Sequence, residues 1–431
     1  MAGGGRGTVT GSGNLDRAAA PHREAFLRHL DEAFRRYGYA EGLPERLRAA
    51  VRATPRHRFV HRFRAGADGP LQDFDADPVG LLPLVYRGQP LTPVDGAGAP
   101  LPSTNSEAAY MLWLVARLGV EPGQRVLEIG CGSGWLLAVM AHLAGPGGRT
   151  TGVEIIPDLA DQARADLAGL GCADAAVLTG DATRAPIPGG PFDRVIVTAA
   201  TWDIPAALFD CVAAGGRLLV PLRLPRDEGC EVTLLRRAGP GFSALWSVPG
   251  FFVPLVGAGQ SAEIARLSRE ALPLRDGTGI APSLSCPLWF GGLAPAQPAA
   301  AAQAFRRYLA LTEPSFAVFE PAASPAPPRW VSDFGLVDRD GGSAAIVGAG
   351  RLTGYGTPAA ARRLARAYRG WCDLGMPGPS AFALDILPAA AVAASPTALT
   401  ELRGHTALVR TLDPQAGALR GLLDGGSGRR A

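Results

Sequence analysis

The stretch Val126-Leu-Glu-Ile-Gly-Cys-Gly-Ser-Gly134 decides the fold of this chain of 431 residues. An apolar run with strand character leads into three glycines at alternate positions, and an apolar segment follows from about Trp135. Glycine permits sharp turns and a close approach of the backbone to a ligand, and the first turn of a helix offers free N–H groups. The stretch therefore predicts a strand, a turn that binds a ligand and a helix, although a tight connection without a ligand would use the same residues.

Outward from this turn, predicted strands and helices alternate. We expect strands at 125–129, 150–154, 175–179, 194–198 and 216–220, and helices at 107–118, from 135, at 159–170 and at 205–212. A parallel pair of strands needs a crossover connection, which a helix provides. The chain is therefore predicted to be an α/β protein with a doubly wound, Rossmann-like parallel sheet.

The region before this sheet has a different pattern. Residues 1–20 are expected to form a disordered tail, and apolar residues at helical spacing in 22–37 and 45–54 predict a helical cap. From 68 to 102 the chain is rich in Gly, Pro and Asp, which predicts an extended lobe with little regular structure and a strand-like run at 82–86.

The region after the sheet shifts in composition toward Ala and Pro, with linkers expected at 293–302 and 321–329. Alternating and helical apolar patterns predict strands at 315–319, 343–347 and 381–387 and a helix at 357–372. We therefore expect two domains, the sheet domain at 21–259 and a small α+β extension at 260–431.

Charge and cysteine usage argue against several classes of protein. The net charge is only +3 and the basic residues are scattered, so no nucleic-acid surface is indicated. The six cysteines never form a C-x-x-C pair, and His57 and His61 lack the glutamate of a zinc-binding helix, so no metal site is expected. No apolar run approaches the roughly 20 residues of a membrane span. A cytoplasmic protein with free thiols fits best.

Acidic residues accompany three successive predicted strands. Glu128 precedes the glycines, Glu154 ends the next strand and Asp181 follows the third. A carboxylate beside the turn would repel a pyrophosphate, but it could bind the amino group or balance the charge of a sulfonium amino acid. Glu154 could accept both hydroxyls of a ribose or simply cap a helix, and Asp181 could accept from an adenine amino group. The pattern favours S-adenosyl-L-methionine, with S-adenosyl-L-homocysteine as its product, over NAD.

Six stretches resemble the protein-L-isoaspartate O-methyltransferase family. They are 54–60, 126–134, 153–157, 195–200, 214–221 and 252–256. The Val-Thr-Ala-Ala sequence within 195–200 distinguishes this family from other methyltransferases. The resemblance implies a class I methyltransferase domain that esterifies an aspartyl or isoaspartyl carboxylate of a peptide. Besides the three acids, it implies cofactor contacts at Gly130, Cys131, Gly132, Ser133, Gly134, Ile155, Ala182 and Thr198.

The acceptor site is implied by the same resemblance. In the family a Thr-x-Ser turn before the first sheet strand contacts the methyl-accepting carboxylate, and Thr104-Asn105-Ser106 occupies this place. Thr104-x-x-Glu107 is also a capping box for the following helix, and both interpretations can hold. The family usually has Gln-Pro after the serine, whereas this chain has Glu107-Ala108, a difference that concerns the substrate and not the cofactor.

The expected chemistry needs no general base, because the acceptor carboxylate, with a pKa of about 4, is already ionised at neutral pH. Ser106 would position this carboxylate rather than act as a nucleophile. The next backbone nitrogen would then attack the methyl ester and expel methanol to give a succinimide, which water reopens, largely to isoaspartate when the starting residue was a normal aspartate.

The extension resembles a branch of the family associated with lanthipeptides and related ribosomally synthesised peptides, including the FxLD-type methyltransferases. The sequence Ala381-Phe-Ala-Leu-Asp-Ile386 is similar to that branch. This resemblance implies a modified precursor peptide as partner, and we expect the extension to help recognise it. Three alternatives remain, namely a general isoaspartyl repair enzyme, a non-catalytic peptide-binding module and a NAD-dependent oxidoreductase.

Overall fold

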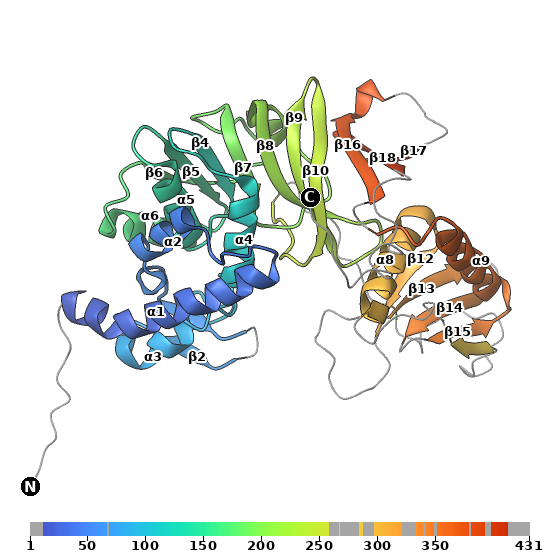
Figure 1. Cartoon of the computed structure of the whole chain (residues 1–431), viewed down its shortest axis with the longest axis horizontal. Helices are drawn as coiled ribbons and strands as arrows, with labels where there is room; N and C mark the ends of the chain where they lie inside the picture. Colours follow the sequence, from blue (N-terminus) through green and yellow to red (C-terminus); the bar gives the residue numbers. More distant parts are fainter. Residues whose placement is uncertain are drawn as a thin grey trace, which may run out of the picture. The chain divides into compact units, whose positions relative to one another are not determined.

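The computed structural model describes residues 12–66, 69–257, 267, 284–287, 297–320, 333–338, 342–348, 351–378, 381–392 and 398–412. The chain forms two compact units, whose elements are labelled in Figure 1. Unit 1 comprises Met1–Ala199, Ala206–Leu219 and Leu255–Ala258, and unit 2 comprises Ala200–Pro205, Val220–Pro254 and Gly259–Ala431. Two stretches of the expected sheet domain thus belong to unit 2, and the domain limit at residue 259 stays a prediction.

Unit 1 contains the predicted parallel sheet. Its strands are β4 (Arg125–Ile129), β5 (Arg149–Glu154), β6 (Ala175–Thr179), β7 (Phe192–Val197) and the first part of β8 (Val212–Arg223). The helices that alternate with them are α4 (Ala108–Leu118), α5 (Trp135–Ala144), α6 (Pro157–Gly169) and α7 (Ala206–Cys211). These elements confirm the α/β class.

The strand order in this unit is β8-β7-β4-β5-β6, and every neighbouring pair is parallel (Figure 1). Glu128 is in register with Gly152 on β5 and with Ile196 on β7, so the carboxyl ends of these strands share one edge of the sheet. The chain order reverses between β4 and β7. Open α/β sheets bind their ligands beyond the carboxyl ends at such a reversal, which places the glycine turn after β4 at the expected site.

The N-terminal part of unit 1 is helical with a small antiparallel sheet of order β2-β1-β3. Its elements are α1 (Ser12–Arg36), α2 (Glu45–Ala53), a 3-10 turn (Arg56–Phe59), β1 (Arg62–Arg64), β2 (Leu71–Asp73), α3 (Pro78–Val85) and β3 (Thr92–Pro93). The helices of the predicted cap are therefore present.

Helix α1 begins earlier than its apolar spacing suggests. It starts at Ser12, so residues 12–20 are helical and not a disordered tail, while residues 1–11 lie outside the described part of the chain. The reason is an ion pair that sequence spacing does not reveal: the Asp16 carboxylate accepts a hydrogen bond from Arg58 at 2.6 Å. This contact ties the first turns of α1 to the body of the unit.

The strand-like run expected at 82–86 is wrong, because residues 82–85 form the second half of α3 and Tyr86 is its C-cap. Asp77 caps the helix by accepting a hydrogen bond from the backbone N–H of Gly80 at 3.0 Å, and Pro78 occupies the first helical position. Both are strong start signals for a helix. They outweigh the apolar character of the segment.

His61 links the small sheet to helix α6. Its Nδ1 donates to Asp75 at 3.2 Å and its Nε2 donates to Asp166 at 3.1 Å. The hydrogen bond and the charge of Asp166 together raise the pKa of His61 to about 9. The imidazolium is therefore the form that stabilises unit 1 at neutral pH.

Replacing His61 with glutamine is expected to lower the free energy of unfolding by about 1 kcal/mol at pH 6, a modest value because a third of the side chain is exposed. The folded pKa of His61 lies above its unfolded value, so its stabilisation is complete below about pH 6.5 and disappears as the pH rises through about 9. Urea unfolding of both proteins from pH 6 to pH 9.5 measures this difference. A constant difference across that range would contradict the assignment.

Unit 2 contains two antiparallel sheets. In the first, of order β17-β18-β16-β10-β9, the strands are β9 (Cys230–Ala238), β10 (Gly241–Gly250), β16 (Phe382–Pro388), β17 (Ala398–Leu402) and β18 (Thr406–Leu412). In the second, of order β11-β15-β14-β13-β12, they are β11 (Leu284–Pro287), β12 (Phe316–Phe319), β13 (Asp333–Asp338), β14 (Ser343–Gly348) and β15 (Arg351–Gly356). The predicted additional α+β region is thus present.

Helices α8 (Gln297–Thr312) and α9 (Ala359–Asp373) pack on the second sheet around Trp371 and Phe305, which are fully buried. The linker expected at 293–302 is wrong from residue 297 onward, because its alanines continue into α8. Alanine is the strongest helix former, and the apolar side of α8 has a core to cover. The linker expected at 321–329 lies outside the described residues.

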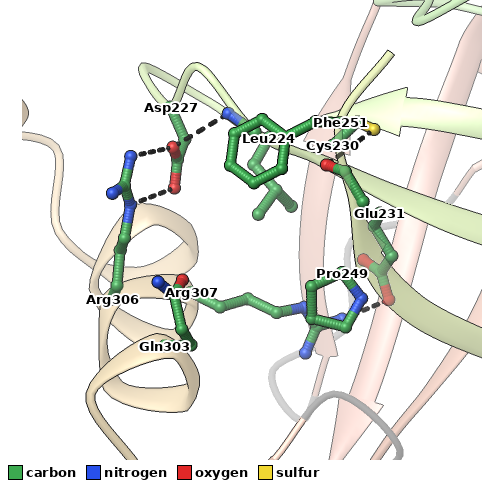
Figure 2. Close-up of a pocket in the computed structure, with 11 residues that line it drawn as sticks. Leu224, Asp227, Cys230, Glu231, Pro249, Phe251, Gln303, Arg306 and Arg307 are labelled. Carbon is green, nitrogen blue, oxygen red and sulfur yellow. Dashed lines mark hydrogen bonds and ion pairs between the residues drawn. The ribbon is translucent and has the colours of Figure 1, made fainter. Parts of the chain in front are cut away.

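Arginines of α8 form buried ion pairs with acidic residues at and just before the start of β9 (Figure 2). Arg306 donates to both carboxylate oxygens of Asp227, at 3.0 and 2.6 Å, and Arg307 donates to Glu231 at 2.5 Å. The pocket between them has a volume of about 40 Å³, which is room for water and not for a peptide. None of the helices in the described ranges is long and apolar enough to cross a membrane.

Candidate active site

The glycine turn after β4 has the backbone that its sequence predicts. Gly130, Gly132 and Gly134 have φ of 81°, 52° and 81°, in the left-handed region that favours glycine. A Cβ on Gly130 would lie 3.0 Å from Thr198 Oγ1, and one on Gly134 would lie 3.1 Å from the Ala163 side chain. Both the conformation and the close packing therefore require glycine.

Cys131 and Ser133 separate these glycines. Cys131 is buried over β5, where a Cβ on Gly152 would lie 2.8 Å from its Sγ. Burial raises the pKa of the Cys131 thiol well above its usual value, so the group stays a neutral thiol. Ser133 is half-buried in the turn. Neither residue has the surroundings of a reactive nucleophile.

Glu154, at the end of β5, holds the turn in place. Its carboxylate accepts hydrogen bonds from Gly132 N at 2.8 Å and from Ile156 N at 3.0 Å. Ile156 is the N-cap residue of α6, but α6 has no side-chain cap and Glu154 is buried, so Glu154 is not the surface capping residue of the alternative. The other bond goes to the middle of the glycine turn. Glu154 is therefore fixed at the site, while its neighbour Ile155 packs beside Gly257.

Glu128, the last but one residue of β4, carries an unsatisfied buried carboxylate. It is only 2% exposed, and its Oε2 has no hydrogen-bond partner among the residues that the structure describes. Burial raises the pKa of Glu128 well above its usual value, and the nearby Glu154 raises it further. A buried acceptor without a donor is costly. The surroundings of Glu128 therefore suit a ligand that brings a positively charged N–H donor.

Asp181 follows β6 in an ordered turn. Its Oδ1 accepts from the backbone N–H and the hydroxyl of Thr183 at 2.9 and 2.6 Å, and its Oδ2 pairs with Arg184 at 3.3 Å. A Cβ on Gly257 would lie 2.6 Å from this carboxylate, so only glycine fits beside it. The next residue, Ala182, is buried. Asp181 is thus oriented by its own turn.

Thr198, directly after β7, connects that strand to the glycine turn. Its hydroxyl lies 2.9 Å from the carbonyl oxygen of Ile129 and 2.7 Å from that of Gly130, and its N–H donates to Ile129 at 3.0 Å. The expected cofactor residues after β4, β5 and β7 are therefore joined by direct contacts. Each acts on the same backbone turn.

The acceptor segment lies next to this turn. Asn105 pairs with Leu91 through two backbone hydrogen bonds of 3.1 and 2.8 Å, and a Cβ on Gly132 would lie 4.0 Å from Asn105 Oδ1. The same Cβ would lie 3.7 Å from Ser103 Oγ, a residue that the Thr-x-Ser pattern misses. The hydroxyl of Ser106 makes no hydrogen bond within the described ranges. The segment thus offers the Ser103 hydroxyl and the Asn105 side-chain carbonyl beside the turn.

The capping box expected for Thr104 and Glu107 is wrong. Helix α4 begins at Ala108, and Glu107 is its N-cap residue. The Glu107 carboxylate accepts from the N–H groups of Ala109 and Tyr110 at 3.2 and 2.7 Å. A single residue therefore provides the cap. Thr104 instead donates to the carbonyl of Leu91 at 3.4 Å.

Arg56 is a second residue that sequence reasoning missed, although the matched stretch 54–60 contains it. Its guanidinium is buried, lies 5.1 Å from the centre of the Trp135 ring and donates to the carbonyl of Asn105 at 3.4 Å. Its Nη1 has no partner in the described part of the chain. Burial lowers the pKa of Arg56 to about 10, so it remains a cation at neutral pH. Arg56 links the acceptor segment to the start of α5.

The two histidines singled out by their spacing form hydrogen bonds with residues that are distant in the sequence. His57 contacts Asp16 at 3.1 Å and Tyr86 at 2.7 Å, and burial lowers the pKa of His57 to about 4. His61 lies between its two aspartates, as described above. Among the residues that the structure describes, no three His, Cys, Asp or Glu side chains are grouped as metal ligands would be.

Comparison with known proteins agrees with this geometry. The family model "Protein-L-isoaspartate(D-aspartate) O-methyltransferase (PCMT)" matches residues 85–260. The protein-L-isoaspartate O-methyltransferase of Methanoculleus marisnigri is 35% identical over 216 residues, which cover 49% of this chain and 84% of that protein. The corresponding protein of Methanopyrus kandleri is 33% identical over 239 residues, which cover 52% of this chain and 93% of that protein. By these matches the chain belongs to the protein-L-isoaspartate O-methyltransferase family.

Proposed function

We propose that this chain transfers a methyl group from S-adenosyl-L-methionine to the free carboxylate of an isoaspartyl residue in a peptide or protein. The observation that carries the proposal is the glycine turn itself. Glu128, two residues before the turn, has a buried Oε2 without a partner among the described residues, and the acceptor segment around Asn105 lies beside Gly132. This arrangement suits a cationic cofactor held beside an anionic acceptor.

Each of the three acids binds a different part of the cofactor. Glu128 receives the amino group of the methionine part, which supplies the donor and the positive charge that its buried carboxylate lacks. Glu154 holds the turn through Gly132 and accepts from the ribose hydroxyls with its remaining lone pairs. Asp181, oriented by Thr183, accepts from the adenine amino group. Bound here, the cofactor supplies an electrophilic methyl group.

The acceptor carboxylate is already ionised at neutral pH, so the protein has to position it and exclude water. Ser106 supports this role because its hydroxyl is free to donate within the described structure. The N-terminus of α4 is not available to a substrate carboxylate, since Glu107 already occupies the N–H groups of Ala109 and Tyr110. Glu107, which departs from the family pattern, thus caps helix α4.

Replacing Ser106 with alanine is expected to lower kcat/KM for an isoaspartyl peptide by about 10- to 100-fold, the value of one hydrogen bond to a charged group. The affinity for S-adenosyl-L-homocysteine should not change, because Ser106 has no proposed cofactor contact. Methyl transfer from radiolabelled cofactor and calorimetric titration measure the two quantities. Ser103→Ala is the matched comparison: a larger loss in that variant would move the acceptor contact from Ser106 to Ser103.

A second candidate function is tailoring of a ribosomally synthesised, lanthipeptide-type precursor at a normal aspartate, as in FxLD-type methyltransferases. It is supported by the extension, where α8, α9 and the second sheet of unit 2 form their own core. The alignments with the two relatives cover only about half of this chain, so most of that region has no counterpart in them.

One assay separates the two functions. Paired linear peptides that differ only in aspartate or isoaspartate are incubated with the cofactor and followed by mass spectrometry, together with a constrained precursor peptide. A repair enzyme adds one methyl group to the isoaspartyl peptide alone. A tailoring enzyme methylates the constrained peptide at aspartate, and loss of methanol then leaves a succinimide. Methylation of the linear isoaspartyl peptide alone would exclude the tailoring function.

A further inference from the structure

Within unit 2, the turn that joins β17 to β18 contacts the loop at 200–205. The side chain of Arg403 in this turn is fully buried; it donates to the carbonyl of Arg223 at 2.9 Å and also to that of Trp202. Its guanidinium lies 4.1 Å from the centre of the Trp202 ring, and Glu401 accepts from it at 3.0 Å. A guanidinium that is stacked and hydrogen-bonded in this way is held in one geometry.

Asp203 forms the second contact between the loop and the hairpin. Its carboxylate accepts hydrogen bonds from the backbone N–H of His405 and from the hydroxyl of Thr406, and from its own neighbour Ile204 at 2.8 Å. A Cβ on Gly404 would lie 3.2 Å from Asp203 Oδ2, so the turn packs closely on this carboxylate. The hairpin therefore holds two consecutive residues of the loop: the Arg403 guanidinium contacts Trp202, and a backbone N–H and a hydroxyl group donate to the Asp203 carboxylate.

Two short connections join this loop to proposed cofactor residues, one to Thr198 and one to Asp181. Ala200 stands two residues after Thr198, whose hydroxyl contacts the glycine turn. The N–H of Ala200 donates to the carbonyl of Val253 at 2.8 Å, and four residues beyond Val253 the chain reaches Gly257, which packs against Asp181. The loop also leaves the carboxyl end of β7, the strand next to the reversal of strand order. Displacement of the loop would thus move the backbone that follows Thr198, while Thr198 itself stays hydrogen-bonded to β4 and the glycine turn.

We propose that the β17–β18 turn positions the 200–205 loop for methyl transfer, with Arg403 and Asp203 as positioning residues. The inference rests on the proposed function and adds a task for the extension: it completes the transferase in addition to any role in peptide recognition. Fixing a loop that follows a proposed site residue in the chain matters because a displacement of reacting groups by about 1 Å can cost about 100-fold in rate. Thr198 is itself held by β4 and the glycine turn, so cofactor affinity should depend on the hairpin much less than turnover does.

The test uses the full chain and four substitutions, one of which, Arg403→Lys, keeps the positive charge at that position. Arg403→Gln removes the charge and the stacking, and Thr406→Val removes one hydrogen bond to Asp203 with little change of shape, in case the first variant does not fold. Arg362→Gln, on the exposed side of α9, is the matched control for loss of an arginine from unit 2. For each protein we would measure amide hydrogen exchange at 201–204, kcat and KM with an isoaspartyl peptide, and the Kd of S-adenosyl-L-homocysteine.

The expected result for Arg403→Gln is at least tenfold faster exchange at 201–204, at least a tenfold lower kcat and a Kd within threefold of wild type. Thr406→Val should change in the same direction by less, Arg403→Lys should recover part of kcat, and Arg362→Gln should match wild type. Unchanged exchange, or faster exchange with unchanged kcat, overturns the proposal, as does an equal loss in Arg362→Gln. Wild-type protein that binds the homocysteine product but methylates no peptide refutes the proposed function instead, and the inference with it.

Discussion

Substituting glutamine for Glu154 is expected to weaken the binding of S-adenosyl-L-homocysteine by about 10- to 150-fold, equivalent to about 1.5–3 kcal/mol for a hydrogen bond to a charged group. In the structure the two carboxylate oxygens accept from Gly132 N and Ile156 N. Glutamine has one acceptor oxygen, so one of these N–H groups would face an amide NH₂ group. The glycine turn would then lose the contact that fixes it.

Calorimetric titration with S-adenosyl-L-homocysteine measures this change, and thermal unfolding shows whether the variant is folded. Glu32→Gln is a suitable control, because it removes the same charge from an exposed residue of α1. Glu32 is also distant in the sequence from the glycine turn. An affinity of the Glu154 variant within twofold of wild type would contradict the placement of the cofactor at this turn.

Placing alanine at Gly132 is expected to lower kcat/KM by at least about 100-fold while the free energy of unfolding falls by only about 1–2 kcal/mol, the cost of a left-handed non-glycine residue. Gly132 has φ of 52°, and its new methyl group would point toward Ser103 Oγ at 3.7 Å and Asn105 Oδ1 at 4.0 Å. It would occupy the space between the turn and the acceptor segment. In the proposed function, cofactor and carboxylate meet there.

Gly147→Ala separates this effect from backbone strain. Gly147 also has a positive φ, of 85°, but a Cβ there would meet no atom within 4 Å. The control should lose a similar amount of stability and keep its full rate of methyl transfer. Urea unfolding and initial rates with an isoaspartyl peptide compare the two proteins. Equal activity of both variants would show that the space beside Gly132 has no part in the reaction.

Sequence reasoning located the proposed cofactor half of the site because that half consists of strand ends. Glu128, Glu154 and Asp181 each stand at a fixed offset from a predicted strand, and parallel strands place their carboxyl ends on one edge. The acceptor half could be located only in part. Ser103 approaches Gly132 because Asn105 pairs with Leu91, and no local pattern reports such a pairing.

The same distinction explains the errors at the helix ends and in the extension. Glu107 caps α4 by reaching forward to Tyr110, a choice between two acceptable capping patterns that only packing decides. The sequence pattern predicts no strand at β13 or β15, because each contains glycine, which weakens the alternating pattern of a strand; in the structure both are paired on two sides. Their residues have low intrinsic strand propensity, and pairing with the neighbouring strands makes them strands nevertheless.

By itself, the sequence determined the parallel α/β sheet, the glycine turn and the acids around it, because these follow from local periodicity and from the conformational freedom of glycine. Only the tertiary structure decided that Arg56 contacts the acceptor segment and that the turn containing Arg403 contacts Trp202, about two hundred residues earlier in the chain. Such contacts depend on which buried charges find partners across the fold. A buried guanidinium needs hydrogen-bond acceptors or an aromatic ring beside it, and the sequence alone does not predict which residues provide them.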